Sequence, residues 1–187
     1  MTILRPDLVL LDRDGVLNID RADYVRTPDQ LVLIDGAAAA VARLNQAGLR
    51  VAICTNQSVV GRGIIPAAML ERIHDALREG LARQGARVDA IFACTDAPGP
   101  PSTHRKPAPG MLIDAMRRFG VAPERTTMIG DSLRDLEAAA AAGAARILVR
   151  TGHGARTQAA GLPRALLPVA VHDDLATAVA TLLGDGA

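Results

Sequence analysis

Residues 8–15 read LVLLDRDG, four apolar side chains followed directly by an Asp-x-Asp-Gly sequence. An uninterrupted apolar run of this length is typical of a strand that is buried on both faces. The pattern recurs, and strands are predicted over residues 8–11, 51–54, 90–94, 127–129, 147–149 and 169–171. Helical patterns alternate with them over residues 36–47, 66–84, 109–119, 133–142 and 175–183. This alternation predicts an α/β fold, Rossmann-like and doubly wound, with a mainly parallel sheet and helices on both faces.

The composition is that of one ordinary globular domain, which we expect to span residues 1–187. Of its 187 residues 49% are hydrophobic, and 21 are basic against 20 acidic. The net charge of +1 argues against nucleic-acid and membrane partners. No apolar run approaches the ~20 residues that span a bilayer, and the acidic residues after the first apolar run argue against a secretory signal. Two cysteines cannot form a disulfide framework, so we expect a protein of the reducing cytoplasm. We also expect it to be a monomer.

Polar side chains gather where the predicted strands end. They are Asp12 and Asp14 after the first strand, Thr55 and Asn56 after the second, and Asp131 and Asp135 after the fourth. The carboxyl ends of parallel strands meet at one edge of the sheet, where such folds bind ligands. Carboxylates that converge there repel each other unless a cation lies among them, and oxygen ligands of this kind suit Mg²⁺. The sequence therefore predicts a magnesium site beside groups that can bind phosphate oxygens.

Lys106 is the single lysine among the 21 basic residues. Arginine replaces lysine freely on a solvated surface, but not where a compact ammonium is required. Lys106 is therefore a candidate for neutralising the charge of a transferring phosphoryl group. Each of these motifs alone has an ordinary structural explanation, as a turn, a helix cap or an acidic first helical turn. Their combination after separate strands favours one functional cleft.

Four segments carry a resemblance to a known family: LDRDGVLN (11–18), TNQSVVGRG (55–63), RKPAPGM (105–111) and GDSLRD (130–135). In order and spacing they resemble the four motifs of the haloacid dehalogenase superfamily of phosphohydrolases. Within it the chain is similar to the D-glycero-D-manno-heptose 1,7-bisphosphate phosphatase group, with histidinol-phosphate phosphatases as near relatives. The resemblance implies a Mg²⁺-dependent phosphoric monoester hydrolase that lacks a cap domain. The implied substrate is a small phosphorylated sugar that loses its C7 phosphate, or alternatively histidinol phosphate or another small phosphomonoester.

The resemblance also implies roles for the motif residues. Asp12 is the expected nucleophile, which forms an aspartyl-phosphate, and Asp14 is the expected general acid and base. Mg²⁺ is expected on Asp12, Asp131 and the backbone carbonyl of Asp14, with Asp135 orienting the site from behind. Thr55 and Lys106 are expected to bind the transferring phosphoryl group. The expected substrate-binding residues are Asp20 and Asp23 in a short flap, Asn56, Gln57 and Ser58 after the second strand, and Arg105.

Two departures from the family pattern concern the rim of the expected cleft. Relatives carry a structural zinc held by three cysteines and one histidine, and here only Cys94 and a lone His104 remain in that stretch. We therefore expect no zinc. Val59 stands where relatives commonly have glycine, so we expect a reshaped loop close to the substrate. Cys54 is expected in the core, and His153 is interpreted as a solvated loop residue, with a place on the rim as the alternative.

Two hypotheses from other functional classes remain open on the sequence. A receiver domain also combines acids, threonine and lysine around Mg²⁺, and Asp96 after the third strand would be its phosphoacceptor. A non-catalytic sugar-phosphate binding protein is the other. The Asp-x-Asp-Gly sequence on the first strand favours hydrolysis over both, because binding alone needs no general acid. Arg13 and Arg62 are interpreted as partners of surface acids.

Overall fold

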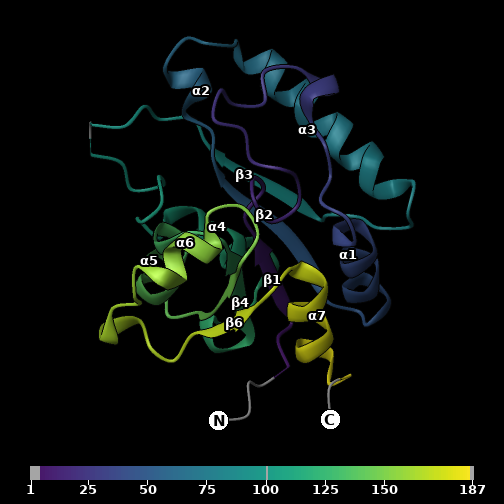
Figure 1. The fold of residues 1–187 in the computed structure, drawn as a ribbon, viewed down its shortest axis with the longest axis vertical. Helices are drawn as coiled ribbons and strands as arrows, with labels where there is room; N and C mark the ends of the chain where they lie inside the picture. Colours follow the sequence, from purple (N-terminus) through teal and green to yellow (C-terminus); the bar gives the residue numbers. More distant parts are fainter. Residues whose placement is uncertain (1–4, 100, 186–187) are drawn as a thin grey trace.

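The computed structural model describes residues 5–99 and 101–185, which form a six-stranded sheet with helices around it (Figure 1). The strands are β1 (Leu8–Leu11), β2 (Arg50–Asn56), β3 (Ala90–Cys94), β4 (Thr126–Gly130), β5 (Ala145–Val149) and β6 (Ala170–His172). The α-helices are α1 (Ala37–Gln46), α2 (Ser58–Gly61), α3 (Ala67–Ala82), α4 (Gly110–Phe119), α5 (Leu133–Ala141), α6 (Gly154–Ala159) and α7 (Leu175–Leu183). All neighbouring strands pair in parallel, which confirms the predicted fold class.

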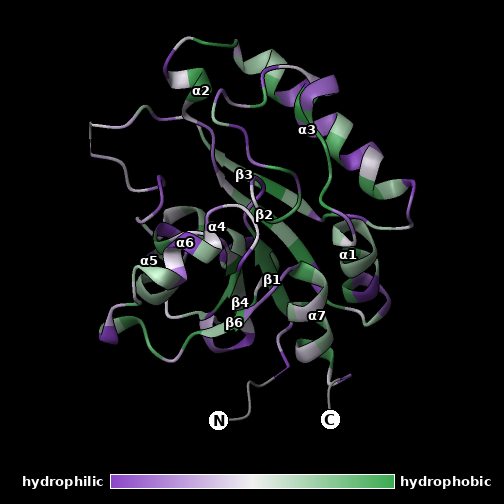
Figure 2. Ribbon diagram, in the orientation of Figure 1, coloured by the Kyte–Doolittle hydropathy of each residue, from purple (hydrophilic) through white to green (hydrophobic). Residues whose placement is uncertain are grey.

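The two faces of the sheet carry separate hydrophobic cores. Successive side chains of a strand point to opposite faces, so Val9 and Leu11 of β1 pack with α1, α3 and α7. Leu8 and Leu10 point the other way and pack with α4 and α5. Figure 2 shows the hydrophobic strands enclosed by helices whose hydrophilic residues lie on the outside. Helices thus cover both faces, and no helix in the described part of the chain has the length and hydrophobicity to cross a membrane.

The strand order places the candidate residues at one point of the sheet. The order is β3-β2-β1-β4-β5-β6, so the chain builds outward from β1 in one direction and then returns to add β4 on the other side. The crevice at the carboxyl ends of β1 and β4 is therefore the topological switch point, where ligands of doubly wound folds bind. Asp12 directly follows β1 and Asp131 directly follows β4.

Residues 58–61 form the short helix α2 where a loop was expected, and its Ser58 and the adjoining Arg62 line the cleft. The expected reshaping relative to relatives stays a prediction. Val59 is fully buried and packs against Val25, Ile65 and Ile73. Its backbone is helical, and Tyr24 is the one non-glycine residue with a positive φ among those described. A valine is therefore accommodated without strain, and its side chain belongs to the core rather than to the substrate rim.

His74 on α3 is a buried histidine that the sequence pattern did not single out. It is 1% exposed, and its Nε2 has no hydrogen-bond partner among the described residues. Burial, with the nearby Arg13 and Arg78 guanidinium groups, lowers the pKa of His74 to about 4. The imidazole is therefore neutral in the folded protein at pH 7.

We expect His74 to make the fold sensitive to acid. Below pH ~6.5 an unfolded histidine takes up a proton, whereas the folded chain does not until about pH 4. The free energy of unfolding therefore falls as the pH drops through this window, by about 2 kcal/mol at pH 5 from this group. Urea unfolding at pH 7.5 and pH 5 should show a smaller loss of unfolding free energy in His74→Gln than in the wild type. The exposed His104→Gln control should keep the wild-type loss, and an undiminished loss in His74→Gln would contradict the assignment.

Candidate active site

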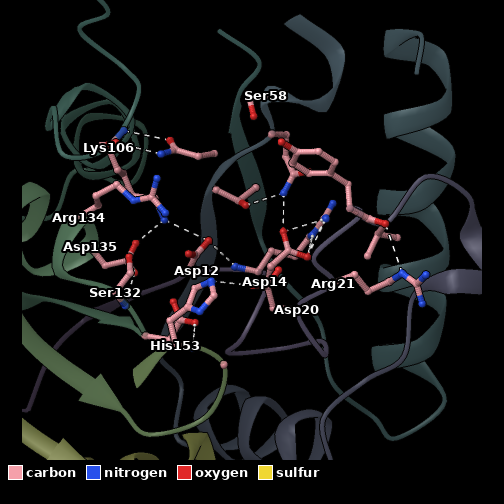
Figure 3. A pocket seen from close by; sticks show the side chains of 18 of the residues that line it. Asp12, Asp14, Asp20, Arg21, Ser58, Lys106, Ser132, Arg134, Asp135 and His153 are labelled. Carbon is pink, nitrogen blue, oxygen red and sulfur yellow. Dashed lines mark hydrogen bonds and ion pairs between the residues drawn. The ribbon is translucent and has the colours of Figure 1, made fainter. Parts of the chain in front are cut away.

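A cleft of about 1150 Å³ opens at the carboxyl ends of the strands. Its walls come from the segments that follow β1, β2, β4 and β5 and from the stretch that leads into α4 (Figure 3). Of the sequence-predicted residues, the structure places these in the lining: Asp12, Asp14, Asp20, Thr55, Asn56, Gln57, Ser58, Arg105, Lys106, Asp131 and Asp135. Asp23 alone falls outside it. Asp23 is exposed and pairs with Arg21, so the structure does not support the predicted substrate contact.

The floor of the cleft is built around the Lys106 ammonium, which is 2% exposed. Its Nζ lies 3.1 Å from Asp12 Oδ1 and 2.6 Å from Asp135 Oδ1 (Figure 3). Burial alone would lower the pKa of Lys106, but the two carboxylates outweigh it and raise the pKa above its usual range. Lys106 is therefore a fixed positive charge between two acids.

Asp135 is held on both of its oxygens. While Oδ1 faces Lys106, Oδ2 accepts hydrogen bonds from the Ser132 backbone N–H (3.0 Å) and hydroxyl (2.6 Å). This exchange is a capping box that starts α5. A carboxylate engaged in this way orients Lys106, and the expected role of Asp135 behind a bound Mg²⁺ stays a prediction.

Asp131 approaches the backbone of two other loops closely. A Cβ at Gly15 or at Gly152 would lie 2.1 Å from Asp131 Oδ2, so only glycine fits at either position. The same oxygen accepts a hydrogen bond from the His153 backbone N–H at 2.8 Å. Burial raises the pKa of Asp131 to about 7 despite that hydrogen bond.

The arrangement fits a divalent cation. Oxygens of Asp12, Asp131 and Asp135 lie within 4.8 Å of one another. Burial also raises the pKa of Asp12 to about 7, and the neighbouring acids add to this effect while Lys106 opposes it. A cation bound between these two acids would replace the protons that they hold near neutral pH and would stabilise their charged forms. An all-oxygen set of this kind is the donor chemistry of Mg²⁺.

Asp14 lies in a different electrostatic environment from Asp12. Arg13 Nη2 lies 2.9 Å from both of its oxygens, and the Asn18 and Gln57 amides each donate to it at 2.8 Å. Burial raises the pKa of Asp14, but these donors prevail and lower it below its usual range. Arg13 is 1% exposed, so the interpretation of Arg13 as a partner of surface acids is wrong.

The polar residues at the end of β2 hold Lys106, Asp14 and Thr55 in place. Asn56 donates its amide to the Lys106 carbonyl and accepts from the Lys106 backbone N–H, both at 3.0 Å. Gln57 bridges Asp14 and Thr55, with a 2.9 Å bond to the Thr55 hydroxyl. The amides of Asn56 and Gln57 are therefore engaged within the protein, which is a different use from the expected contact with substrate. Ser58 lines the cleft, as expected.

The opposite wall contains an ion pair that the sequence did not reveal. His153 Nε2 lies 2.9 Å from Asp20 Oδ2 (Figure 3), so it joins the loop after β5 to the segment after β1. His153 lines the cleft, which was the alternative interpretation, although its side chain is still 43% exposed. No sequence signal pairs these residues, because they lie 133 positions apart and meet only through the sheet order.

Asp96 and Cys94 lie outside this constellation. Asp96 is exposed, is absent from the cleft lining and accepts a hydrogen bond from Ser102, so the structure does not support a receiver phosphoacceptor there. Cys94 contacts Ser102, with 3.8 Å between sulfur and oxygen. The expectation of no bound zinc remains a prediction. Cys54 is fully buried in the core, as predicted.

We expect Mg²⁺ to stabilise the fold through Asp131. A ligand that binds only the folded state adds about 2.7 kcal/mol at a hundred times its dissociation constant. Thermal unfolding of the wild type should therefore shift upward with added Mg²⁺, and Asp131→Asn should abolish the shift. The exposed Asp23→Asn variant is the control and should respond as the wild type does. An unreduced shift in Asp131→Asn would place the cation elsewhere.

Comparisons with known proteins agree with this geometry. The haloacid dehalogenase-like hydrolase family matches residues 4–143. The D-glycero-beta-D-manno-heptose-1,7-bisphosphate 7-phosphatase of Bordetella bronchiseptica is 45% identical over 177 residues, 94% of this chain and 97% of that protein. Its counterpart in Pseudomonas aeruginosa is 44% identical over 176 residues, 94% of this chain and 97% of that protein. The crystal structure of D,D-heptose 1,7-bisphosphate phosphatase from B. bronchiseptica, complexed with magnesium and phosphate, matches with a TM-score of 0.90, 45% identity and coverage of 95% of this chain and 98% of that chain. The chain therefore belongs to the haloacid dehalogenase-like hydrolase family.

Proposed function

We propose that the protein is a Mg²⁺-dependent phosphatase that removes the C7 phosphate of D-glycero-β-D-manno-heptose 1,7-bisphosphate. The names of its close relatives support the substrate. The observation that carries the chemistry is the Asp12 carboxylate at the cleft floor, beside Lys106 and Asp131 and next to the separately held Asp14. The same proposal includes one capless hydrolase domain that acts as a monomer in the cytoplasm.

The proposed reaction has two displacements at phosphorus. Asp12 attacks the phosphorus atom, the bond to the sugar oxygen breaks, and the sugar oxygen takes a proton from Asp14. A water molecule then gives its proton to Asp14 and attacks the aspartyl-phosphate, which releases phosphate and restores Asp12. Lys106 and Thr55 stabilise the charge on the phosphoryl oxygens. Mg²⁺ bound by Asp12, Asp131 and the Asp14 carbonyl would supply further charge neutralisation.

The environment of Asp14 bears on both steps. Arg13 and its neighbours favour the carboxylate form, which is the form that accepts a proton from water. To protonate the sugar oxygen, Asp14 first has to carry a proton against this stabilisation. The described arrangement therefore matches the hydrolysis of the intermediate better than its formation.

Three arginines at the mouth of the cleft favour a substrate with a second anionic group. Arg62, Arg105 and Arg134 come from three different segments and all line the cleft. Partial burial, and after it the positive charges of Arg134 and Arg62, lower the pKa of Arg105, and none of the three arginines forms an ion pair within the described residues. Arg62 is thus not the partner of a surface acid. Such a rim attracts a distal phosphate and repels the ammonium of histidinol phosphate.

Removal of Arg105 should reduce the preference for bisphosphates. We expect Arg105→Ala to lower kcat/KM for the heptose bisphosphate relative to kcat/KM for the heptose 7-phosphate. The change should correspond to about 2–3 kcal/mol of transition-state binding energy, because a charge-assisted contact is lost. Phosphate release from sugar phosphates, nucleotides and histidinol phosphate with Mg²⁺ measures this. Arg164→Ala, outside the cleft, is the control. An unchanged ratio would remove Arg105 from the distal site, and histidinol phosphate as the best substrate would contradict the sugar assignment while leaving the phosphatase assignment intact.

Lys106→Arg should inactivate the enzyme even though arginine keeps the positive charge. The ammonium occupies a buried site between Asp12 and Asp135 that a larger planar guanidinium does not fit. We expect kcat on p-nitrophenyl phosphate to fall about 100-fold or more. Circular dichroism checks that the variant folds. Wild-type turnover in folded Lys106→Arg would refute the role.

A further inference from the structure

The segment between β3 and Lys106 is organised around one hydroxyl group, that of Ser102. Ser102 Oγ accepts hydrogen bonds from the backbone N–H groups of His104 (3.2 Å) and Arg105 (2.9 Å). It also lies 2.6 Å from Asp96 Oδ2, to which it donates its proton. Cys94 Sγ lies 3.8 Å away on the remaining side. One side chain therefore ties the start of the segment, at Cys94 and Asp96, to its end, at Arg105.

The same network holds both ends of the Arg105 side chain. Its backbone N–H is bonded to Ser102, and its guanidinium Nη1 donates to the Asp96 carbonyl at 3.1 Å. Ser102 thus fixes the carboxylate of Asp96, and the backbone carbonyl of Asp96 holds the Arg105 guanidinium. The next residue, Lys106, is fixed separately by Asn56. Arg105 therefore depends on the Ser102 network, whereas Lys106 at the cleft floor does not.

We infer that Ser102 is a positioning residue for substrate selectivity, which acts by holding Arg105 toward the mouth of the cleft. The inference rests on the proposed function, because it assigns Arg105 to the distal phosphate. Loss of the hydroxyl leaves the Asp96 carboxylate and two backbone N–H groups without this partner. Arg105 then occupies its binding position for a smaller fraction of the time, which weakens apparent affinity in proportion.

The test compares two substrates in the wild type and three variants. In Ser102→Ala, KM for the heptose bisphosphate should rise about tenfold, as expected for a weakened charge-assisted contact. The kcat/KM for p-nitrophenyl phosphate, which has no distal phosphate, should change less than twofold. Ser102→Thr keeps a hydroxyl and should restore the wild-type KM. Thr103→Ala removes the neighbouring exposed hydroxyl and is the matched control, which should behave as the wild type.

A double-mutant cycle separates positioning from a general loss of structure. If Ser102 acts through Arg105, Ser102→Ala should add little to the effect of Arg105→Ala. An equal tenfold loss in the Arg105→Ala background, or an equal loss on both substrates, would overturn the inference. So would an unchanged KM in Ser102→Ala.

A binding measurement makes the result independent of turnover. Calorimetry of the bisphosphate with the Asp12→Asn protein, with and without Ser102→Ala, should show the same tenfold difference in dissociation constant. If Asp12→Asn binds the bisphosphate equally well with either residue at 102, the inference alone is wrong. If neither the wild type nor Asp12→Asn binds it, the proposed substrate is wrong and the assignment of Ser102 to selectivity falls with it.

Discussion

The ion pairs of Lys106 with Asp12 and Asp135 are the interaction on which the rest of the site depends. Three buried or nearly buried carboxylates meet at the switch point of the sheet, and burying charges without partners costs several kcal/mol each. Asp12, Asp131 and Asp135 together carry three negative charges when ionised, and Lys106 cancels one. The remainder matches the charge of one divalent cation. Asp14 is balanced separately by Arg13, so Asp12 and Asp14 do not pair with the same cation.

This charge balance explains why so many polar side chains contact each other rather than the open cleft. Asn56 fixes the backbone of Lys106, Gln57 links Asp14 to Thr55, and Ser132 fixes Asp135. A buried charge is stabilised only when its geometry is maintained, because an ion pair that opens leaves an uncompensated charge. Residues that a motif assigns to the substrate thus hold the reacting groups in place.

The sequence predicted the parts of the structure that follow from local patterns. Apolar runs placed all six strands, and the strand ends placed Asp12 and Asp131 together, because parallel strands bring their carboxyl ends to one edge. Contacts set by loop paths were not predictable. The pairing of His153 with Asp20 and the approach of Arg62 and Arg134 to Arg105 depend on segments that share no local signal. Burial of Arg13 was missed because its neighbours in sequence are acids that equally fit a surface pair.

Chemistry and selectivity are placed in different layers of the cleft. The floor carries the acids and the ammonium: Asp12 and Asp131 directly follow β1 and β4, Asp135 lies in the first turn of α5, and Lys106 lies in the stretch that leads into α4. The mouth carries the arginines, which come from the end of α2, the stretch before α4 and the start of α5. Under the proposed function, the reacting phosphate would need only the floor. A second phosphate would gain its binding energy at the mouth, from the Arg105 charge that the Ser102 and Asp96 hydrogen bonds orient. Changes in the loops can therefore alter which phosphate ester is chosen while the transfer itself stays the same.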